Sequence, residues 1–246
     1  MRHWLSTAAA VVCALAGFAR PIAAPTVDEI VARHLEARGG AERLKAIQTI
    51  KFTRKVATQF NTVDVIILKK RPQLFRAESA PPGGPMTVRG VNPEGAWDTA
   101  QGGKIVMRSA DAAAETRELD ADFDGPLVNW KAKGHTVTYE GTESLPGGDA
   151  HKLKIVTRSG IVRTIYLDAQ TYLDRRHTGV LNLPGGRRFD VSIDFGDWQE
   201  VGGVKFPFDI SEERTGKEPV QSLATYTVKI EVNVPMDDAL FATPKG

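Results

Sequence analysis

The sequence VDVIILKKRPQLFRAE, residues 63–78, decides the fold class of this chain. Val63, Val65 and Ile67 recur at every second position, which is the spacing of side chains on one face of a β-strand. Pro72 removes a backbone donor from the strand ladder, so one strand is expected to end there and another to begin. Arg71 falls at this break. A lone arginine at such a place is most often a solvated turn residue.

Alternation of apolar and polar residues extends well beyond this stretch. Residues 49–60 have the pattern of a long, half-buried strand, and shorter strands are expected at 86–91, around Trp97 and at 104–107. Glycine-containing turns separate the later β-rich segments, and such short connections predict an antiparallel meander. These later segments are 135–143, 151–157, 162–167, 172–181, 187–195, 204–211 and 223–232.

A helix is expected to precede the strands. Thr26 and Glu29 form the sequence pattern of a capping box, and apolar residues then recur at helical spacing until Gly39. His34 is expected at the surface beside this apolar stripe. A second, short helix is expected at residues 41–47. The two helices are equally consistent with a fixed covering for a sheet and with a moving lid.

A further helical segment, separate from the two N-terminal helices, is expected in the middle of the chain at residues 112–119, with Ser109 as its cap. The sequence DADFDG at 120–125 resembles the opening of a calcium-binding loop, but Lys131 occupies the position where such a loop needs a glutamate. Calcium is therefore not expected. A short and strongly apolar segment follows, which is either a lid or an ordinary connection. Its apolar residues are Phe123, Leu127, Val128 and Trp130.

Together these features resemble the LolA/LolB family of lipoprotein carriers. The resemblance is carried by RPQLF at 71–75, KLKI at 152–155, RTIYLD at 163–168, VGGVKFP at 201–207 and NVPMDDALF at 233–241, in that order. It implies a mainly β, α+β fold: an incomplete antiparallel barrel of about eleven strands, with an N-terminal helix and a helical insertion acting as a lid. One such domain would span residues 25–246. It also implies that Arg71 hydrogen-bonds the lid over a lipid cavity.

An open barrel of this kind would hold an acyl chain against apolar side chains without a catalytic residue. Each buried methylene group contributes roughly 0.8 kcal/mol to such binding. The candidate residues for the cavity wall and the lid are Ile50, Phe52, Ile67, Arg71, Leu74, Trp97, Phe123, Leu127 and Trp130.

The N-terminus has the pattern of a secretory signal peptide. Arg2 and His3 precede an apolar run at residues 5–19, and small residues follow up to position 24. The run is shorter than the about 20 residues that a membrane span needs. Cleavage is expected between residues 19 and 24, which would place the mature protein in the periplasm. Cys13 lies inside this segment, so a thiol enzyme is not expected.

The charge balance and the absence of motifs restrict the function. Removal of the signal peptide leaves 30 basic residues against 30 acidic ones, since Arg2 and Arg20 are lost from 32. A nucleic-acid binder would carry a basic excess. The sequence has no Gly-x-Ser-x-Gly elbow, no His-Glu-x-x-His pair and no phosphate-binding glycine loop.

Together with the family resemblance, the sequence predicts a noncatalytic, monomeric carrier without a cofactor or metal. The partners that the resemblance implies are an acylated lipoprotein or lipid, an inner-membrane donor protein and an outer-membrane acceptor protein. Two alternatives stay open: a sensor or interaction module on the same scaffold, and, less favoured, an exported hydrolase whose site has no recognised motif.

Overall fold

The structure, a computed structural model, describes residues 24–183 and 187–244, and its main feature is one sheet of thirteen strands. Each strand pairs with its neighbours in an antiparallel manner. The strands are β1 (Thr49–Ala57), β2 (Thr62–Lys70), β3 (Leu74–Ala80), β4 (Thr87–Asn92), β5 (Gly95–Thr99), β6 (Ile105–Met107), β7 (Thr136–Leu145), β8 (Gly148–Val156), β9 (Val162–Asp168), β10 (Asp174–Leu183), β11 (Arg187–Val201), β12 (Val204–Gly216) and β13 (Gln221–Val232).

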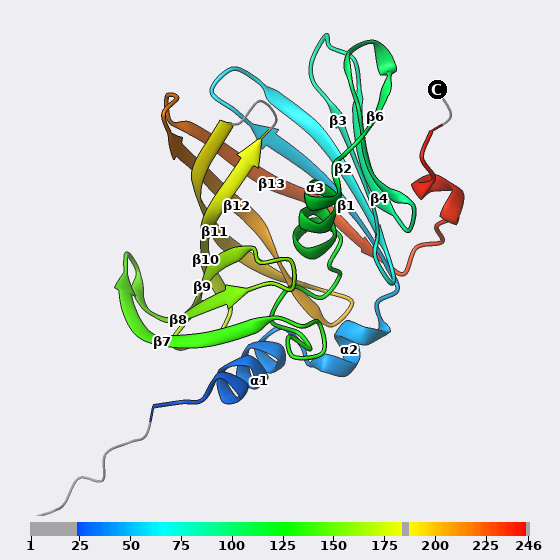
Figure 1. Cartoon of the computed structure of the whole chain (residues 1–246). Helices are drawn as coiled ribbons and strands as arrows, with labels where there is room; N and C mark the ends of the chain where they lie inside the picture. Colours follow the sequence, from blue (N-terminus) through cyan, green and yellow to red (C-terminus); the bar gives the residue numbers. More distant parts are fainter. Residues whose placement is uncertain (1–23, 184–186, 245–246) are drawn as a thin grey trace, which may run out of the picture.

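The order of strands across the sheet is β6-β5-β4-β3-β2-β1-β13-β12-β11-β10-β9-β8-β7. The sheet is strongly curved, and β6 and β7 form its two separate edges (Figure 1). The predicted incomplete antiparallel barrel is therefore confirmed, with thirteen strands in place of about eleven. The predicted break at Pro72 is also present, because β2 ends at Lys70 and β3 begins at Leu74.

Helical segments lie at one end of the sheet and inside its curve. Figure 1 shows α1 (Val27–Ala37) and α2 (Ala41–Ala46) below the sheet, and α3 (Ala110–Glu115) within its concavity. The expected capping box is present at the start of α1: the Glu29 amide donates to the Thr26 hydroxyl, and the Glu29 carboxylate accepts from the Thr26 amide. The remaining helical turns are η1 (Gln101–Gly103), η2 (Thr116–Asp120) and η3 (Asp238–Phe241).

The strand order determines the path of the long segment that connects β6 to β7. The chain leaves the sheet at one edge, β6, and re-enters it at the opposite edge, β7. The connection between these strands contains α3, η2 and the apolar segment around Phe123, and we call residues 108–135 the insertion. Ala113 and Ala121 of the insertion pack against Phe75 and Val91 on the inner side of the sheet. The insertion therefore crosses the concave face.

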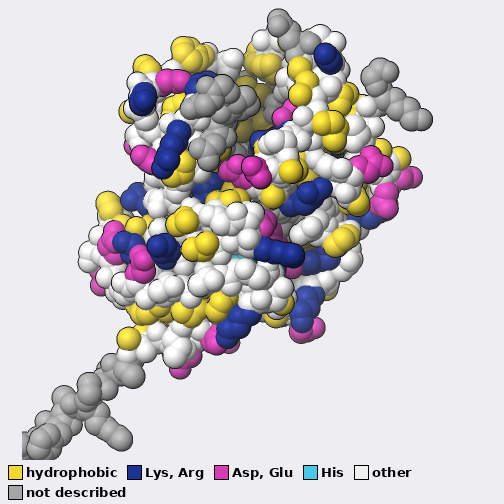
Figure 2. Space-filling model, in the orientation of Figure 1, with side chains coloured by type: hydrophobic (Ala, Val, Ile, Leu, Met, Phe, Trp, Pro, Cys, Tyr) yellow, Lys and Arg dark blue, Asp and Glu magenta, His cyan; other side chains and the backbone are white. Residues whose placement is uncertain are grey.

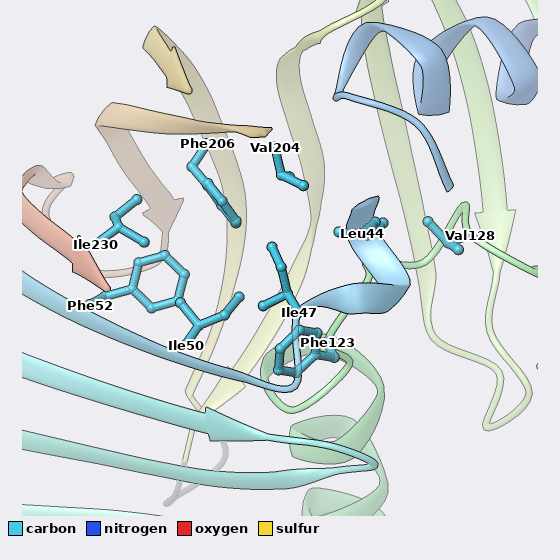
Figure 3. Close-up of a cluster of buried hydrophobic side chains, with 9 residues drawn as sticks. All are labelled: Leu44, Ile47, Ile50, Phe52, Phe123, Val128, Val204, Phe206 and Ile230. Atoms are coloured by element: carbon cyan, nitrogen blue, oxygen red, sulfur yellow. The ribbon is translucent and has the colours of Figure 1, made fainter. Parts of the chain in front are cut away.

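Side-chain alternation gives the sheet an apolar inner face. Phe52 pairs with Ile67 on β2 and with Ile230 on β13, so these three side chains point to the same side. They belong to a buried cluster that joins β1, β12 and β13 to α2 and the insertion (Figure 3). The nine buried members are Leu44, Ile47, Ile50, Phe52, Phe123, Val128, Val204, Phe206 and Ile230.

The position of His34 differs from the prediction. His34 was expected at the surface, but its ring is buried between α1 and the β9–β10 turn, with 2% of the residue exposed. Its Nδ1 atom lies 2.9 Å from the carbonyl oxygen of Tyr172. The ring is buried because the turn supplies a polar partner that helical spacing alone does not reveal.

Candidate ligand-binding site

Arg71 lies in the turn between β2 and β3 and binds the end of α2. Its Nε donates to the carbonyl oxygen of Ile47 at 2.8 Å, and one terminal nitrogen, Nη2, donates to that of Leu44 at 2.9 Å. Carbonyl groups in the last turn of a helix have no partner within the helix. The guanidinium therefore adds a donor at the end of α2, where the Leu44 carbonyl also accepts from the Ile47 amide, and holds this helix against the sheet.

The same guanidinium also binds the insertion. Nη1 donates to Oδ2 of Asp124 at 2.9 Å, and Nη2 donates to Oδ1 at 2.5 Å. The guanidinium carbon lies 4.2 Å from the centre of the Phe123 ring, which adds a cation–π contact. Only 22% of the Arg71 side chain and 14% of the Asp124 side chain are exposed. Arg71 is thus a partly buried tie between α2, the β2–β3 turn and the insertion.

The three aspartates of DADFDG bind three different cations. Asp124 binds Arg71, Asp122 lies 2.7 Å from Nζ of Lys133, and Asp120 lies 3.4 Å from Arg89. Their carboxylates therefore do not converge on one point. Among the residues that the structure describes, no group of three or more His, Cys, Asp or Glu side chains is placed to hold a metal ion.

Four of the candidate apolar residues meet on the inner face. Ile50, Phe52 and Phe123 are buried in the cluster of Figure 3, and Ile67 packs against it. Leu127 and Trp130 lie in a neighbouring cluster, where the insertion and α1 cover β7, β8 and β9. The insertion therefore joins two apolar regions of the inner face.

Leu74 and Trp97 lie on the other side of the sheet. Leu74 pairs with Lys70, and Trp97 pairs with Gly90, at positions that alternate with the inner residues Phe75 and Ala96. The C-terminal turn η3 packs against β3 and β4, and it covers this outer region. The expected placement of Leu74 and Trp97 on the cavity wall does not match this register. The sequence could not show which face the C-terminal segment covers.

Beyond the insertion, the inner face is open. Its apolar side chains there are only half-buried, although they continue the rows of Phe52 and Phe206. Figure 2 shows the surface hollowed between the β10–β12 side and the β3–β6 side, with hydrophobic side chains in the hollow. We call this region the hollow. Its half-buried apolar residues include Val56, Val65, Ile193, Phe195, Ile210 and Leu223.

Two shallow grooves lie elsewhere. One, of about 380 Å³, follows β10 to β12, and another, of about 440 Å³, lies at the ends of β1 and β11 to β13. Ser211, Ser222 and Ala224 line the second groove. These residues alternate with Ile210 and Leu223 and so face outwards. The second groove borders the hollow at Leu223, which lines both.

Two cations of the inner face were not among the candidates. Arg54 occupies the strand position between Phe52 and Val56 on their face, and Lys69 pairs with Ile50 on that face. Burial lowers the pKa of Arg54 to about 10. Burial also lowers the pKa of Lys69 to about 8. A basic residue in an otherwise apolar row of a strand is the sequence signal that points to Arg54.

A polar cluster joins α1 to β10. Asp174 lies 2.8 Å from Nε2 of His177 and 3.9 Å from Nε2 of His34. Burial raises the pKa of Asp174, but the two histidines and Arg38 outweigh this effect and hold it below its ordinary value. Burial lowers the pKa of His34, although Asp174 opposes the shift. Asp174 is thus a carboxylate stabilised by the helix and the strand together.

The fold and the Arg71 tie define a half-barrel protein whose concave face is crossed by a helical insertion. No protein-family model matches the sequence, and no curated protein matches it. Solved structures do match. A LolA superfamily protein from Nitrosomonas europaea superposes with a TM-score of 0.61 at 12% identity, over 89% of this chain and 99% of that chain.

Two further structures have the same fold. A putative outer membrane lipoprotein-sorting protein domain from Vibrio parahaemolyticus gives a TM-score of 0.58 at 9% identity, over 88% of this chain and 97% of its own. A DUF1329 family protein from Desulfovibrio piger gives 0.56 at 11% identity, over 88% and 97%. The predicted LolA-like fold is therefore confirmed. At these identities the likeness concerns the fold alone.

The expected signal peptide lies outside the described residues, apart from its last position. In the part of the chain that the structure describes, no helix has both the length and the apolar character needed to cross a membrane.

Proposed function

We propose that this protein is a noncatalytic periplasmic carrier, which shelters the acyl chains of a lipoprotein or lipid and passes them towards the outer membrane. The observation that carries the proposal is the placement of Arg71. This single side chain ties the insertion over an apolar concave face, through the carboxylate of Asp124 and two carbonyl groups of α2. The insertion is thus held in part by a charged contact that must break before it can lift.

The free energy of burying an acyl chain can be set against the free energy of the bonds that hold the insertion. A sixteen-carbon chain gains on the order of 10 kcal/mol when it leaves water. A hydrogen bond to a charged group contributes about 1.5–3 kcal/mol. Two such bonds join Arg71 to Asp124, and the insertion is also held by ion pairs such as Arg89–Asp120 and by buried apolar side chains such as Phe123 and Leu127. A long acyl chain would replace apolar contacts that the lifted insertion loses, whereas a ligand of a few carbon atoms would replace few of them.

The fold supports this class of cargo. The Vibrio parahaemolyticus structure is described as a putative lipoprotein-sorting domain, and it shares the half-barrel of this chain. On this basis we propose an acylated lipoprotein or lipid as the cargo, an inner-membrane protein as donor and an outer-membrane protein as acceptor. The export signal at residues 1–24 and a monomeric carrier are parts of the same proposal.

A second function on the same scaffold is favoured by the sheet edges. Strands β6 and β7 each lack a neighbour on one side in the described sheet, and an open edge allows a partner strand to pair. Val106 and Met107 on β6 are 45% and 52% exposed. A sensor would use such an edge to bind a partner protein while a lipid occupies the concave face.

Native mass spectrometry of the purified mature protein tests the proposal. We expect a co-purifying acylated ligand, and transfer of that ligand to acceptor vesicles or to an acceptor protein. The variant Asp124→Asn should alter the rate of hand-over, because it removes the charge that Arg71 binds. Asp64→Asn is the matched control, since Asp64 forms an exposed pair with Lys55. A protein that binds no acylated molecule would disprove the carrier, and binding without transfer would favour the sensor.

A further inference from the structure

Two cationic side chains lie on the inner face of the sheet, on neighbouring strands. Arg54 on β1 lies opposite Val65 on β2 and Thr227 on β13. Lys69 lies further along β2, opposite Ile50. Both therefore alternate with residues of the outer face and belong to the same inner rows as Phe52 and Ile67.

Arg54 has no acidic partner in the part of the chain that the structure describes. Its Nε atom is buried and makes no hydrogen bond within residues 24–183 and 187–244, and in the same ranges its guanidinium forms no ion pair. The guanidinium carbon lies 4.5 Å from the centre of the Phe52 ring, while the side chain as a whole is half-buried. The cation is thus held against an apolar wall at the boundary of the hollow. An unpaired charge in such surroundings is unfavourable, and an anion would relieve it.

Lys69 is in a similar position. Its ammonium group has no hydrogen bond and no ion pair in the described part of the chain. Four charged groups influence it: Asp120 and Asp122 raise its pKa, and Arg54 and Arg89 lower it. Burial is the largest influence and, with the two arginines, lowers the pKa of Lys69 to about 8. The two aspartates already bind other cations, so they leave the charge of Lys69 largely unbalanced.

Three other cations near this face differ from these two. Arg71 binds Asp124, Arg163 lies 4.0 Å from Glu115, and Arg214 lies 2.5 Å from Glu212. Each therefore has its own carboxylate. Arg54 and Lys69 have no carboxylate partner among the described residues, and they influence each other electrostatically. The inner face thus holds two positive charges that no described side chain neutralises directly.

We propose that the hollow binds an anionic amphiphile, whose carboxylate or phosphate group lies between Arg54 and Lys69 inside the half-barrel. This inference rests on the proposed carrier function and names its ligand class. The ligand's hydrocarbon chain lies along the half-buried apolar residues beside Arg54, including Val56 and Val65. A small inorganic anion would satisfy the two cations but would leave these apolar residues in water.

Isothermal titration calorimetry on the mature protein tests this inference with ligands of equal chain length. Decanoate and decyl phosphate carry the anionic group, decanol lacks it, and acetate and inorganic phosphate lack the chain. We expect both anionic amphiphiles to bind at least tenfold more tightly than decanol, and the two small anions to bind more weakly still. A tenfold preference is the order expected for one charge-assisted contact.

Variants test whether Arg54 and Lys69 cause the preference for anionic ligands. Arg54→Gln and Lys69→Gln should each reduce the preference for decanoate over decanol by roughly tenfold. Lys55→Gln is the matched control, because Lys55 is the neighbour of Arg54 on the outer face and binds Asp64. If Arg54→Gln fails to fold, Arg54→Lys keeps the charge and should keep the preference. In the wild type, the affinity for decanoate should fall between pH 7 and pH 9.5 as Lys69 loses its proton, and Lys69→Gln should not show this fall.

The outcomes separate the two proposals. Equal binding of decanoate and decanol would overturn the anionic ligand and leave the carrier intact. Failure of every ten-carbon ligand and every longer acyl ligand would overturn the carrier, and the anionic ligand with it. Acetate or phosphate binding as tightly as the amphiphiles would show a site for free anions, and would also overturn the inference. A preference that Arg54→Gln and Lys69→Gln leave unchanged would place the anion elsewhere and overturn it as well.

Discussion

Arg71 and Asp124 form a two-point ion pair across 53 positions of sequence, with Nη1–Oδ2 and Nη2–Oδ1 distances of 2.9 and 2.5 Å. Both side chains are mostly shielded from water. A two-point pair fixes the orientation of both groups as well as their separation. The insertion is therefore held in one defined position over the concave face.

Removing the charge of Asp124 should weaken this arrangement. We expect Asp124→Asn to lower the free energy of unfolding by about 2 kcal/mol, because the guanidinium of Arg71 then lacks its carboxylate in partly buried surroundings. Urea unfolding measures the change. Hydrogen exchange should quicken in the insertion more than in β1. The exposed control Asp64→Asn should change stability by less than about 0.5 kcal/mol. An unaltered urea midpoint for Asp124→Asn would show that the Arg71–Asp124 ion pair does not stabilise the fold.

The two faces of the sheet can be told apart by ligand binding. Ile67 and Leu74 are large aliphatic residues of β2 and β3, on the inner and outer face respectively. We expect Ile67→Ala to weaken the binding of an acyl ligand by roughly tenfold, through lost apolar contact. Leu74→Ala should leave the affinity unchanged. Fluorescence titration with a labelled fatty acid compares them, and the reverse ranking would refute the assignment of faces.

Gly90 provides a test of the outer packing. A Cβ atom at this position would lie 2.6 Å from Cζ2 of Trp97, which is fully buried. We expect Gly90→Ala to destabilise the protein by about 1–3 kcal/mol, because the indole must move within a packed region. Gly196→Ala is the control, since the nearest atom to its added Cβ lies 3.9 Å away. Thermal unfolding compares the two variants, and equal melting temperatures would show that Trp97 is not tightly packed.

Acid should loosen the attachment of α1. Burial holds the pKa of His34 below its ordinary value of 6.5, so the folded state binds this proton less readily than the unfolded state. The stability that His34 contributes is therefore complete above pH 6.5 and is lost as the pH falls through the lower, folded-state pKa. The lowered pKa of Asp174 acts in the same direction at still lower pH, below its ordinary value of 3.8.

Replacement of His34 isolates this effect. We expect His34→Gln to flatten the fall in unfolding free energy between pH 7 and pH 5, measured by urea denaturation at each pH. The slope should decrease only in part, because burial also lowers the pKa values of His135 and His151. A variant with the same slope as the wild type would show that His34 does not take part.

Features that depend on neighbouring residues could be predicted from the sequence. The capping box at Thr26 and the strand break at Pro72 depend on neighbouring residues only, and both are present in the structure. The alternation around Phe52 gave the strand, and also the face that Arg54 shares. Short-range patterns of this kind are set by backbone geometry, which every strand and helix obeys.

Contacts between residues far apart in the sequence could not be predicted. His34 is buried because Tyr172, 138 positions away, supplies a carbonyl group. Trp97 is on the outer face, and that face is covered because η3 returns to β3 and β4 from the end of the chain. Asp124 was one of three similar aspartates, and only the path of the insertion decides which of them meets Arg71. Alternation identifies two faces, but it does not say what lies over each.

The pairing of β1 with β13 has a consequence for the order in which the protein assembles. Ile50 lies opposite Val232, so the middle of the sheet cannot form until nearly the whole chain is present. Contacts between residues so far apart in sequence form late and slow the folding reaction. A polypeptide that emerges with its N-terminus first must keep β1 without a permanent neighbour on that side until the last strand arrives. Under the export proposed above, this delay would let the chain cross the membrane before the sheet becomes compact.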